Sequence, residues 1–351
     1  MQTLPTRRNR HHEKAINTLA ALICGIVGAQ HTQLPKLVST APSQGAKPAS
    51  RLKRFTRWVE NDRMTYATFF LPFAQAVLAA LADQPVVLIM DGRTVGRGCV
   101  TLMLSVVYGG RALPLAWLVV KGAKGHFPEA THLALVAQIQ PHIPPGATVI
   151  FLGDGEFDGT DLQATIHGYG WQYVCRTAST IVIWYGDARI PFAALGVHPD
   201  EIVSVADVQV TQARYGPVLA LAVWEPAFTT PLYLVSNLRD AETAVQWYRQ
   251  RGQIEPFFSD QKRRGFRIDQ SHLSNPLRVA RLLIAACLAY IWMIYLGARA
   301  RRDGWDRIIH RTDRCDGSLF QLGMHFLDHC QNESLRIDVA FCPPPPLSAV
   351  T

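Results

Sequence analysis

The chain has 351 residues, of which 48% are hydrophobic and 18% charged, so it can bury a large core and is not a disordered polypeptide. Its formal net charge is +8, and residues 1–66 carry eleven Lys or Arg against three acids, so this segment alone accounts for the net charge. A concentrated basic segment indicates a polyanionic partner, although a solubilising surface would have the same composition.

The first 84 residues are predicted to form a helical, basic module. Apolar residues recur at helical spacing over 12–30 and again over 66–82, whereas the basic stretch 35–50 is rich in Pro, Ser and Gly and is expected to be a loop. Residues 1–30 imitate a signal peptide, but the helical periodicity favours an amphipathic helix. The seven cysteines include no Cys-x-x-Cys pair, which favours reduced thiols and a cytoplasmic location.

From residue 85 the pattern changes to short β-branched runs. PVVLIMD ends on Asp91, and two further strand-like runs at 98–108 and 112–121 are joined by Gly109-Gly110, which predicts a hairpin. A helix at 129–140, a strand at 147–154 ending on Asp154, a helix at 160–167 and a strand at 171–176 follow. This order is typical of the first part of a ribonuclease H-like α/β core, over residues 85–176, although several mixed α/β folds begin similarly.

The remainder is predicted in three parts. Residues 177–238 show only strand patterns and form a β-strand insertion, after which helical periodicity returns and the core resumes over 239–300. The apolar run 279–297 is nearly long enough to span a bilayer, but Arg281 lies inside it, so a buried core helix is favoured and no membrane association is expected. Residues 301–351, with four consecutive prolines at 343–346, are expected to be a poorly ordered C-terminal tail.

Two aspartates share one position in the predicted sheet. Asp91 and Asp154 each follow an apolar strand directly and precede a glycine. Carboxylates at adjacent strand ends can present oxygen ligands to a hard divalent cation. The alternative is that each is a turn residue, for which Asp before Gly is common.

The segment YRQRGQIEPFFSDQK places Tyr248, Arg251, Glu255 and Lys262 at spacings of three, four and seven. On a regular helix these residues fall within roughly a 60° arc. Such a face can combine a metal-binding carboxylate with cations that neutralise phosphate oxygens, although a solvated face with Arg-Glu pairing has the same spacing. Pro256 predicts a kink or a helix start at Glu255.

Tyr-x2-Arg-x3-Glu-x6-Lys resembles the signature of DDE transposases of the bacterial insertion-sequence-four group, and all four positions match. The resemblance implies a catalytic and metal-binding triad of Asp91, Asp154 and Glu255 with two Mg²⁺ or Mn²⁺ ions, and DNA-end contacts from Tyr248, Arg251 and Lys262. It further implies a homodimer on paired DNA ends, acting on element ends and target DNA by cut-and-paste through a hairpin. The segment GEFDG after Asp154 departs from many relatives and leaves hairpin handling open.

The resemblance also implies that the N-terminal module, residues 1–84, binds DNA. Its leading contacts are expected to be Arg51, Lys53, Arg54 and Arg57, unless these form only a solvated helix face. In the insertion, Trp184 and Trp224 could receive an unstacked base, and Trp224 is preferred because it ends a strand beside a loop, although strand tryptophans usually pack inward. Two alternatives remain: a ribonuclease H-like metal-dependent nuclease, and a catalytically silent DNA-binding protein derived from a transposase.

Overall fold

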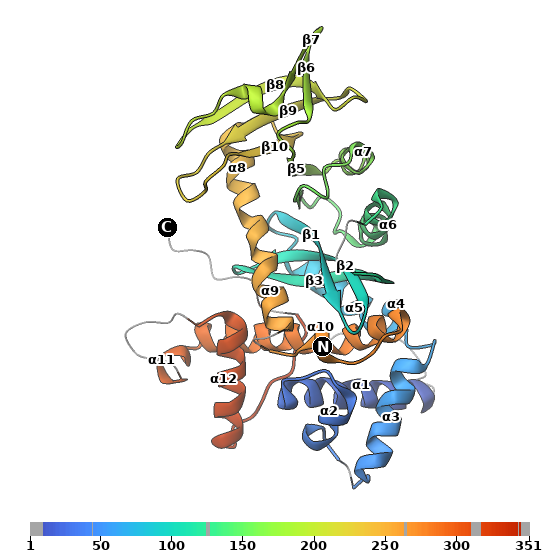
Figure 1. The fold of residues 1–351 in the computed structure, drawn as a ribbon. Helices are drawn as coiled ribbons and strands as arrows, with labels where there is room; N and C mark the ends of the chain where they lie inside the picture. The colour runs from blue at the N-terminus through green and yellow to red at the C-terminus, as the bar shows by residue number, and fades with distance from the viewer. Residues whose placement is uncertain are drawn as a thin grey trace.

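The protein is described here as a computed structural model, which covers residues 10–43, 45–123, 127–262, 265–309, 317–342 and 344 (Figure 1). Its fold is mixed α/β, built on one large sheet with helices around it. The N-terminal module is helical, as predicted: α1 (Arg10–Ala29), α2 (Leu34–Thr40), α3 (Pro48–Glu60), α4 (Tyr66–Phe69) and α5 (Leu71–Ala80).

The expected loop at 35–50 is wrong, because it contains all but the first residue of α2 and the start of α3. Pro35 and Pro48 lie in the first turn of these helices. A proline there removes no intrahelical hydrogen bond and its fixed φ suits the helix, so the residues that suggested a loop instead start two helices.

The first half of the sheet follows the predicted order. β1 (Val86–Val95), β2 (Cys99–Tyr108) and β3 (Arg111–Lys121) form an antiparallel meander, whose second turn is the predicted Gly109-Gly110 hairpin with both glycines at positive φ. After α6 (Glu129–Ile139) and the short η1 (Gln140–His142), β4 (Val149–Gly153) pairs in parallel with β1. β5 (Gln172–Thr177), which follows α7 (Thr160–Gly168), pairs in parallel with β4.

The predicted β-strand insertion is present, and its strands continue the same sheet. These strands are β6 (Val182–Tyr185), β7 (Ala188–Pro191), β8 (Ile202–Val210), β9 (Tyr215–Val223) and β10 (Leu232–Ser236), with the single-turn η2 (Phe192–Leu195) between β7 and β8. β10 pairs antiparallel with β5, so the ten strands run in the order β3-β2-β1-β4-β5-β10-β9-β8-β6-β7. The insertion is therefore hydrogen-bonded to the core rather than packed as a separate sheet.

The C-terminal half supplies the helices that cross the core. These are α8 (Ala241–Arg249), η3 (Gln250–Gln253), α9 (Ile254–Gln261), η4 (Ile268–Gln270), α10 (Pro276–Arg302), α11 (Asp306–Ile309) and α12 (Leu319–Asn332). Figure 1 shows α8 and α9 in nearly one line, running from the inserted strands toward α10. α9 begins one residue before Glu255, in agreement with the helix start expected near Pro256.

Helix α10 accounts for the long apolar run. Within the described part of the chain it is long and apolar enough to cross a membrane, and the bent pair α1 and α2 passes the same test if taken as one span. However, 83% of the most apolar window of α10 is buried inside the protein. It contacts α1, α3, α12 and β3, so its apolar side chains pack inside the protein core.

The expectation of a poorly ordered tail after residue 300 is wrong for residues 319–332. These residues form α12, whose start is capped by a reciprocal Ser318–Gln321 pair and whose apolar face is buried. α12 crosses α10 at two glycines: a Cβ on Gly297 would lie 1.9 Å from the Leu319 carbonyl oxygen, and one on Gly323 would lie 1.9 Å from that of Met293. The two backbones therefore approach as closely as glycine allows.

Candidate active site

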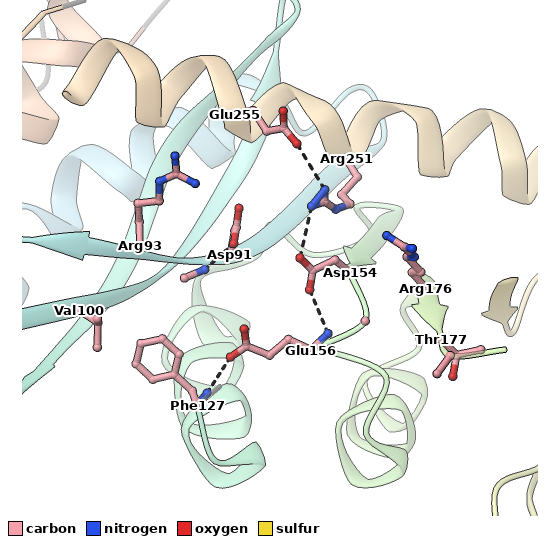
Figure 2. A pocket seen from close by; sticks show the side chains of 13 residues that line it. Asp91, Arg93, Val100, Phe127, Asp154, Glu156, Arg176, Thr177, Arg251 and Glu255 are labelled. Atoms are coloured by element: carbon pink, nitrogen blue, oxygen red, sulfur yellow. Dashed lines mark hydrogen bonds and ion pairs between the residues drawn. The ribbon is translucent and has the colours of Figure 1, made fainter. Parts of the chain in front are cut away.

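A cavity of about 630 Å³ opens where β1, β4 and β5 face the consecutive helices η3 and α9 (Figure 2). The described residues that line it are Asp91, Gly92, Arg93, Val100, Phe127, Asp154, Gly155, Glu156, Arg176, Thr177, Ala178, Arg251 and Glu255. The three predicted catalytic carboxylates are thus brought to one cavity from segments up to 164 positions apart in the sequence, as the numbers of Asp91 and Glu255 show.

Strand register brings the two aspartates together. β1 pairs in parallel with β4, and the last pair is Ile89 with Leu152. Asp91 and Asp154 each lie two residues beyond that pair, so both side chains emerge on the same face of the sheet where the β1–β4 pairing ends. The expectation that Asp91 ends its strand is wrong, because β1 continues to Val95 through its pairing with β2. Asp91 is therefore held on a paired strand.

Backbone donors hold both carboxylates in place. The Gly92 N–H donates to Asp91 Oδ1 at 2.7 Å, and the Glu156 N–H donates to Asp154 Oδ1 at 3.0 Å. Burial, and next the negative charge of Asp154, raise the pKa of Asp91 to about 6, although Arg251 acts in the opposite direction. Two carboxylates held together under partial burial form a site that a cation would stabilise.

Arg251 forms ion pairs with two of the three carboxylates. Its Nη2 is 3.3 Å from Asp154 Oδ2 and its Nη1 is 3.8 Å from Glu255 Oε1, so the guanidinium bridges the two acids (Figure 2). The Glu255 side chain is 70% exposed. Among the described residues, no three His, Cys, Asp or Glu side chains lie close enough to form a compact metal site. The predicted three-carboxylate metal site is therefore not assembled in this arrangement, because Arg251 separates Glu255 from Asp154.

Tyr248 and Lys262 do not line the cavity. Tyr248 is half-buried on α8, and burial raises its pKa to about 12. Lys262 lies just after the end of α9, and its Nζ donates to Thr94 Oγ1 at 2.9 Å. The single helical face predicted for the four signature residues does not form, because η3 winds more tightly than an α-helix and Lys262 has left the helix.

Two arginines at the cavity were not predicted. Arg93 lies two residues after Asp91 on β1, so the period of two in a strand could have placed both on one face. Arg176 lies beside Asp154, because Gly153 pairs with Cys175 and each residue follows directly. The position of Arg176 beside Asp154 could not be predicted from the sequence, because it depends on the β4–β5 pairing. Together with Arg251, these two arginines provide three guanidinium groups at the cavity that can bind phosphate oxygens.

Glu156 and Phe127 close one side of the cavity. The Phe127 N–H donates to Glu156 Oε1 at 2.7 Å. The Phe127 ring packs on Gly92, where a Cβ would lie 2.9 Å from Phe127 Cε2. Glu156 thus makes two contacts at the site. Its N–H binds Asp154, and its carboxylate binds the backbone of Phe127, whose ring covers Gly92 beside Asp91. A larger residue at position 92 would have to displace the Phe127 ring.

The predicted DNA contacts of the N-terminal module divide into two groups. Arg51 is wrong as a DNA contact, because it is buried and its Nη1 donates to the Ala41 carbonyl oxygen at 2.8 Å. Lys53, Arg54 and Arg57 lie on the other side of α3 and line a second hollow. Arg7 and Arg8, which contribute to the basic segment, lie outside the described residues.

The two tryptophans of the insertion differ in their surroundings. Trp184 carries the Arg214 guanidinium 4.0 Å from its ring centroid, so one face of the indole is covered. Trp224 follows the end of β9 directly, as expected, and its Nε1 donates to the Phe228 carbonyl oxygen at 3.0 Å. Trp224 does not line the catalytic cavity. Its role in receiving a base stays a prediction.

Comparison with known proteins gives one family. The family model described as "Transposase DDE domain" matches residues 83–292, which contain β1, Asp91, Asp154, Glu255 and most of α10. No curated protein matches the chain. A cryo-EM structure of a piggyBac transposase synaptic complex with hairpin DNA is similar at 13% identity and a TM-score of 0.49, and the match covers 97% of this chain and 76% of that one.

Proposed function

This chain belongs to the DDE transposase family, and from that premise we propose that it cleaves DNA at the ends of an insertion sequence and joins those ends to target DNA at the cavity described above. The proposal rests chiefly on one observation. The β1–β4 register places Asp91 and Asp154 side by side, in a cavity that also contains Glu255 and Arg251. This placement supports a catalytic triad of Asp91, Asp154 and Glu255 as part of the proposal.

Divalent metal ions fit the donor set of this cavity. Its carboxylate oxygens are the ligands that Mg²⁺ and Mn²⁺ prefer, and the raised pKa of Asp91 indicates a cost of ionisation that a bound cation would offset. Asp91 and Asp154 would hold such ions, with Glu255 joining them once it leaves Arg251. A bound pair of ions would activate the attacking oxygen and stabilise the leaving oxygen of the phosphodiester.

The chain's own residues would position the DNA strand. Arg251 exchanges its contacts with Asp154 and Glu255 for phosphate oxygens when DNA enters, which frees both carboxylates. Arg93 and Arg176 lie on opposite sides of the aspartates in Figure 2 and contact phosphates on either side of the reacting one. These two contacts define the path of the strand across the cavity.

The finer assignments are part of the same proposal. The strand and helix order over 86–177 supports a ribonuclease H-like core, and the basic face of α1 and α3 supports DNA binding by the N-terminal module. Membership of the insertion-sequence-four group, with Tyr248, Arg251 and Lys262 on the DNA end, rests on the Tyr-Arg-Glu-Lys spacing. We include cut-and-paste through a hairpin, action as a homodimer on paired ends, and a location in the bacterial cytoplasm without membrane attachment.

Cleavage of the element's own ends tests the proposal. The purified chain is incubated with Mg²⁺ and a duplex that carries its flanking repeats, and the strand breaks are mapped on a denaturing gel. Asp91→Asn, Asp154→Asn and Glu255→Gln should each reduce cleavage to undetectable levels while binding is retained, because amides are poor ligands for hard cations. Removal of Mg²⁺ with a chelator should have the same effect on the wild type.

Asp161→Asn is the matched control. Asp161 is an exposed acid in the first turn of α7, seven positions after Asp154, and it does not line the cavity. This variant should cleave normally. Full cleavage by any of the three triad variants would remove that residue from the triad. DNA binding without cleavage by the wild type would instead favour a catalytically silent DNA-binding protein.

A further inference from the structure

A second hollow, of about 730 Å³, is lined by residues of α1, α3 and α4 and of the segment that joins α3 to α4. Figure 1 shows α1 and α3 at the opposite end of the molecule from the inserted strands. The hollow is rich in permanently charged side chains, namely Lys14, Lys53, Arg54, Arg57 and Arg63, and two histidines of α1 add to them. No Asp or Glu is among the described residues that line it. A concave site of one charge sign attracts an anion.

Two of the acids of the same module, Glu60 and Asp62, pair with arginines of another helix. Glu60, at the end of α3, lies 3.0 Å from Arg278 of α10, and Asp62 pairs with Arg281 of the same helix. Arg281 also donates to the Val59 carbonyl oxygen at 3.1 Å. These contacts fix α3 on the core helix α10 and direct both carboxylates to arginines outside the hollow.

Arg54 provides a second indication of a ligand. Its Nε is buried and has no hydrogen-bond partner among the described residues. A buried guanidinium N–H without an acceptor is costly, so such a group in a native protein calls for a partner. Movement of the Arg54 side chain toward the hollow would let its guanidinium donate to an oxygen of a bound anion.

The wall of the hollow is aromatic. Trp58, Phe69 and Met64 are buried side chains that line it. The His12 ring stacks on Phe69 with their centroids 5.5 Å apart and an interplanar angle of 27°. Trp58 Nε1 donates to the Ala15 carbonyl oxygen at 3.1 Å, so its N–H is already used, and the half-buried His12 ring is the aromatic surface that a ligand can reach. A phosphate group alone would leave this wall unused, whereas a flat ring would cover it.

The size of the hollow agrees with a ligand larger than phosphate. Sites for whole small molecules measure roughly 300–1,000 Å³, and this hollow falls within that range. Cations combined with an aromatic platform are the usual means of holding a single-stranded nucleotide, with the cations on the backbone and the ring on the base. A duplex phosphate backbone would need only the charged rim.

We propose that the hollow between α1 and α3 is a second nucleic-acid site that receives one unpaired nucleotide of a DNA strand, with its phosphate on the cations and its base beside His12 and Phe69. The proposal rests on the proposed function to the extent that DNA is the ligand. Because α3 is tied to α10 through Arg278 and Arg281, the site has a fixed position relative to the catalytic core.

The test measures the affinity of the full chain for a labelled single-stranded oligonucleotide and for the duplex of the same sequence, by fluorescence anisotropy in a chelator so that no cleavage occurs. In the double variant Lys53→Ala/Arg57→Ala we expect single-strand affinity to fall by about tenfold or more, with the slope of log affinity against log salt shallower by about 1.4 for two lost phosphate contacts. His12→Ala should weaken single-strand binding by about fivefold or more and leave duplex binding unchanged, because it removes a stacking surface.

Lys36→Ala is the matched control. Lys36 is an exposed lysine of α2 in the same module, and it does not line the hollow. This variant should change neither affinity by more than about twofold, because it removes a charge but no phosphate contact. Near-ultraviolet circular dichroism of each variant verifies that α1 and α3 still pack.

Three results would overturn the proposal. The first is a double variant that loses single-strand and duplex affinity equally, and by no more than Lys36→Ala does. That result would show that the hollow is only a charged surface. The second is unaltered single-strand binding by His12→Ala in a folded protein. The third is competition by inorganic phosphate as strong as that by a short oligonucleotide, which would make the hollow an anion site only. A wild type that cleaves element ends but shows any of these results would refute this inference alone, whereas one that binds no DNA would refute the proposed function as well.

Discussion

Replacing Asp91 by Asn should make the metal-free protein more stable at neutral pH while abolishing its cleavage of DNA. Asp91 is half-buried on β1 beside Asp154, and burial together with that neighbouring charge raises its pKa from the ordinary 3.8 to about 6. The Asp91 carboxyl therefore binds its proton more tightly in the folded protein than in the unfolded chain. At pH 7.5, where the carboxyl is ionised in both states, this difference destabilises the folded state. Asparagine has nearly the same shape and removes that charge.

The size of the effect follows from the pKa. A tenfold change in proton affinity corresponds to about 1.4 kcal/mol. Raising the pKa from 3.8 to about 6 therefore destabilises the folded state at pH 7.5 by at most ~3 kcal/mol, less where solvent reaches the carboxyl. Because the pKa is higher in the folded state, the penalty is absent below the unfolded pKa and grows as the pH rises through the interval from 3.8 to about 6. At pH 4.5 it amounts to ~1 kcal/mol.

The assay is urea denaturation of the wild type and Asp91→Asn in the presence of a chelator at pH 7.5 and pH 4.5. The free energy of unfolding of the variant should exceed that of the wild type by ~3 kcal/mol or less at pH 7.5, and the gain should fall by about two thirds at pH 4.5. Asp187→Asn, which removes an exposed carboxyl from the turn between β6 and β7, should give no gain at either pH.

Two outcomes would refute the reasoning. A gain of the same size at both pH values would show that shape rather than charge is responsible. No gain at pH 7.5 would show that ionising Asp91 does not destabilise the folded protein, and hence that Arg251 fully offsets the effects of burial and of the Asp154 charge. Asp154→Asn offers a contrast, because it removes the 3.3 Å ion pair with Arg251 together with the like charge, so its gain should be smaller.

Three further predictions concern the metal, the core and the insertion. Mg²⁺ should raise the melting temperature of the wild type and not of Asp91→Asn, and an equal rise in both would contradict binding at that carboxylate. Gly323→Ala should lower the free energy of unfolding by about 1–3 kcal/mol because its Cβ would lie 1.9 Å from the Met293 carbonyl oxygen, whereas Gly168→Ala, with open space at its Cβ, should not; equal stabilities would contradict the close α10–α12 approach. Trp224→Ala should slow hairpin formation more than the first nick, with an effect of roughly 5–100-fold for a lost base platform, and equal slowing of both steps on gels would exclude that role.

Local pattern in the sequence was sufficient to predict most elements and the candidate triad. Apolar runs with β-branched residues predicted β1 to β5, because a strand buried on both faces needs apolar side chains at nearly every position. Helical periodicity predicted α1, and the resemblance of the Tyr-Arg-Glu-Lys spacing to a transposase signature suggested Glu255 as a partner of Asp91 and Asp154. These features are encoded in a few consecutive residues, so no knowledge of the tertiary contacts was required.

The tertiary structure alone decided which polar side chains face the site. Arg51 looks like its neighbours in the sequence, but α3 turns it onto the Ala41 carbonyl oxygen, whereas Lys53 and Arg57 face the hollow. The pairing of β4 with β5 brings Arg176 to Asp154, and Arg251 bridges acids that are 101 positions apart by their numbers, Asp154 and Glu255. Such contacts join residues distant in the chain, and their geometry depends on strand register and helix rotation, which periodicity of a single segment does not specify.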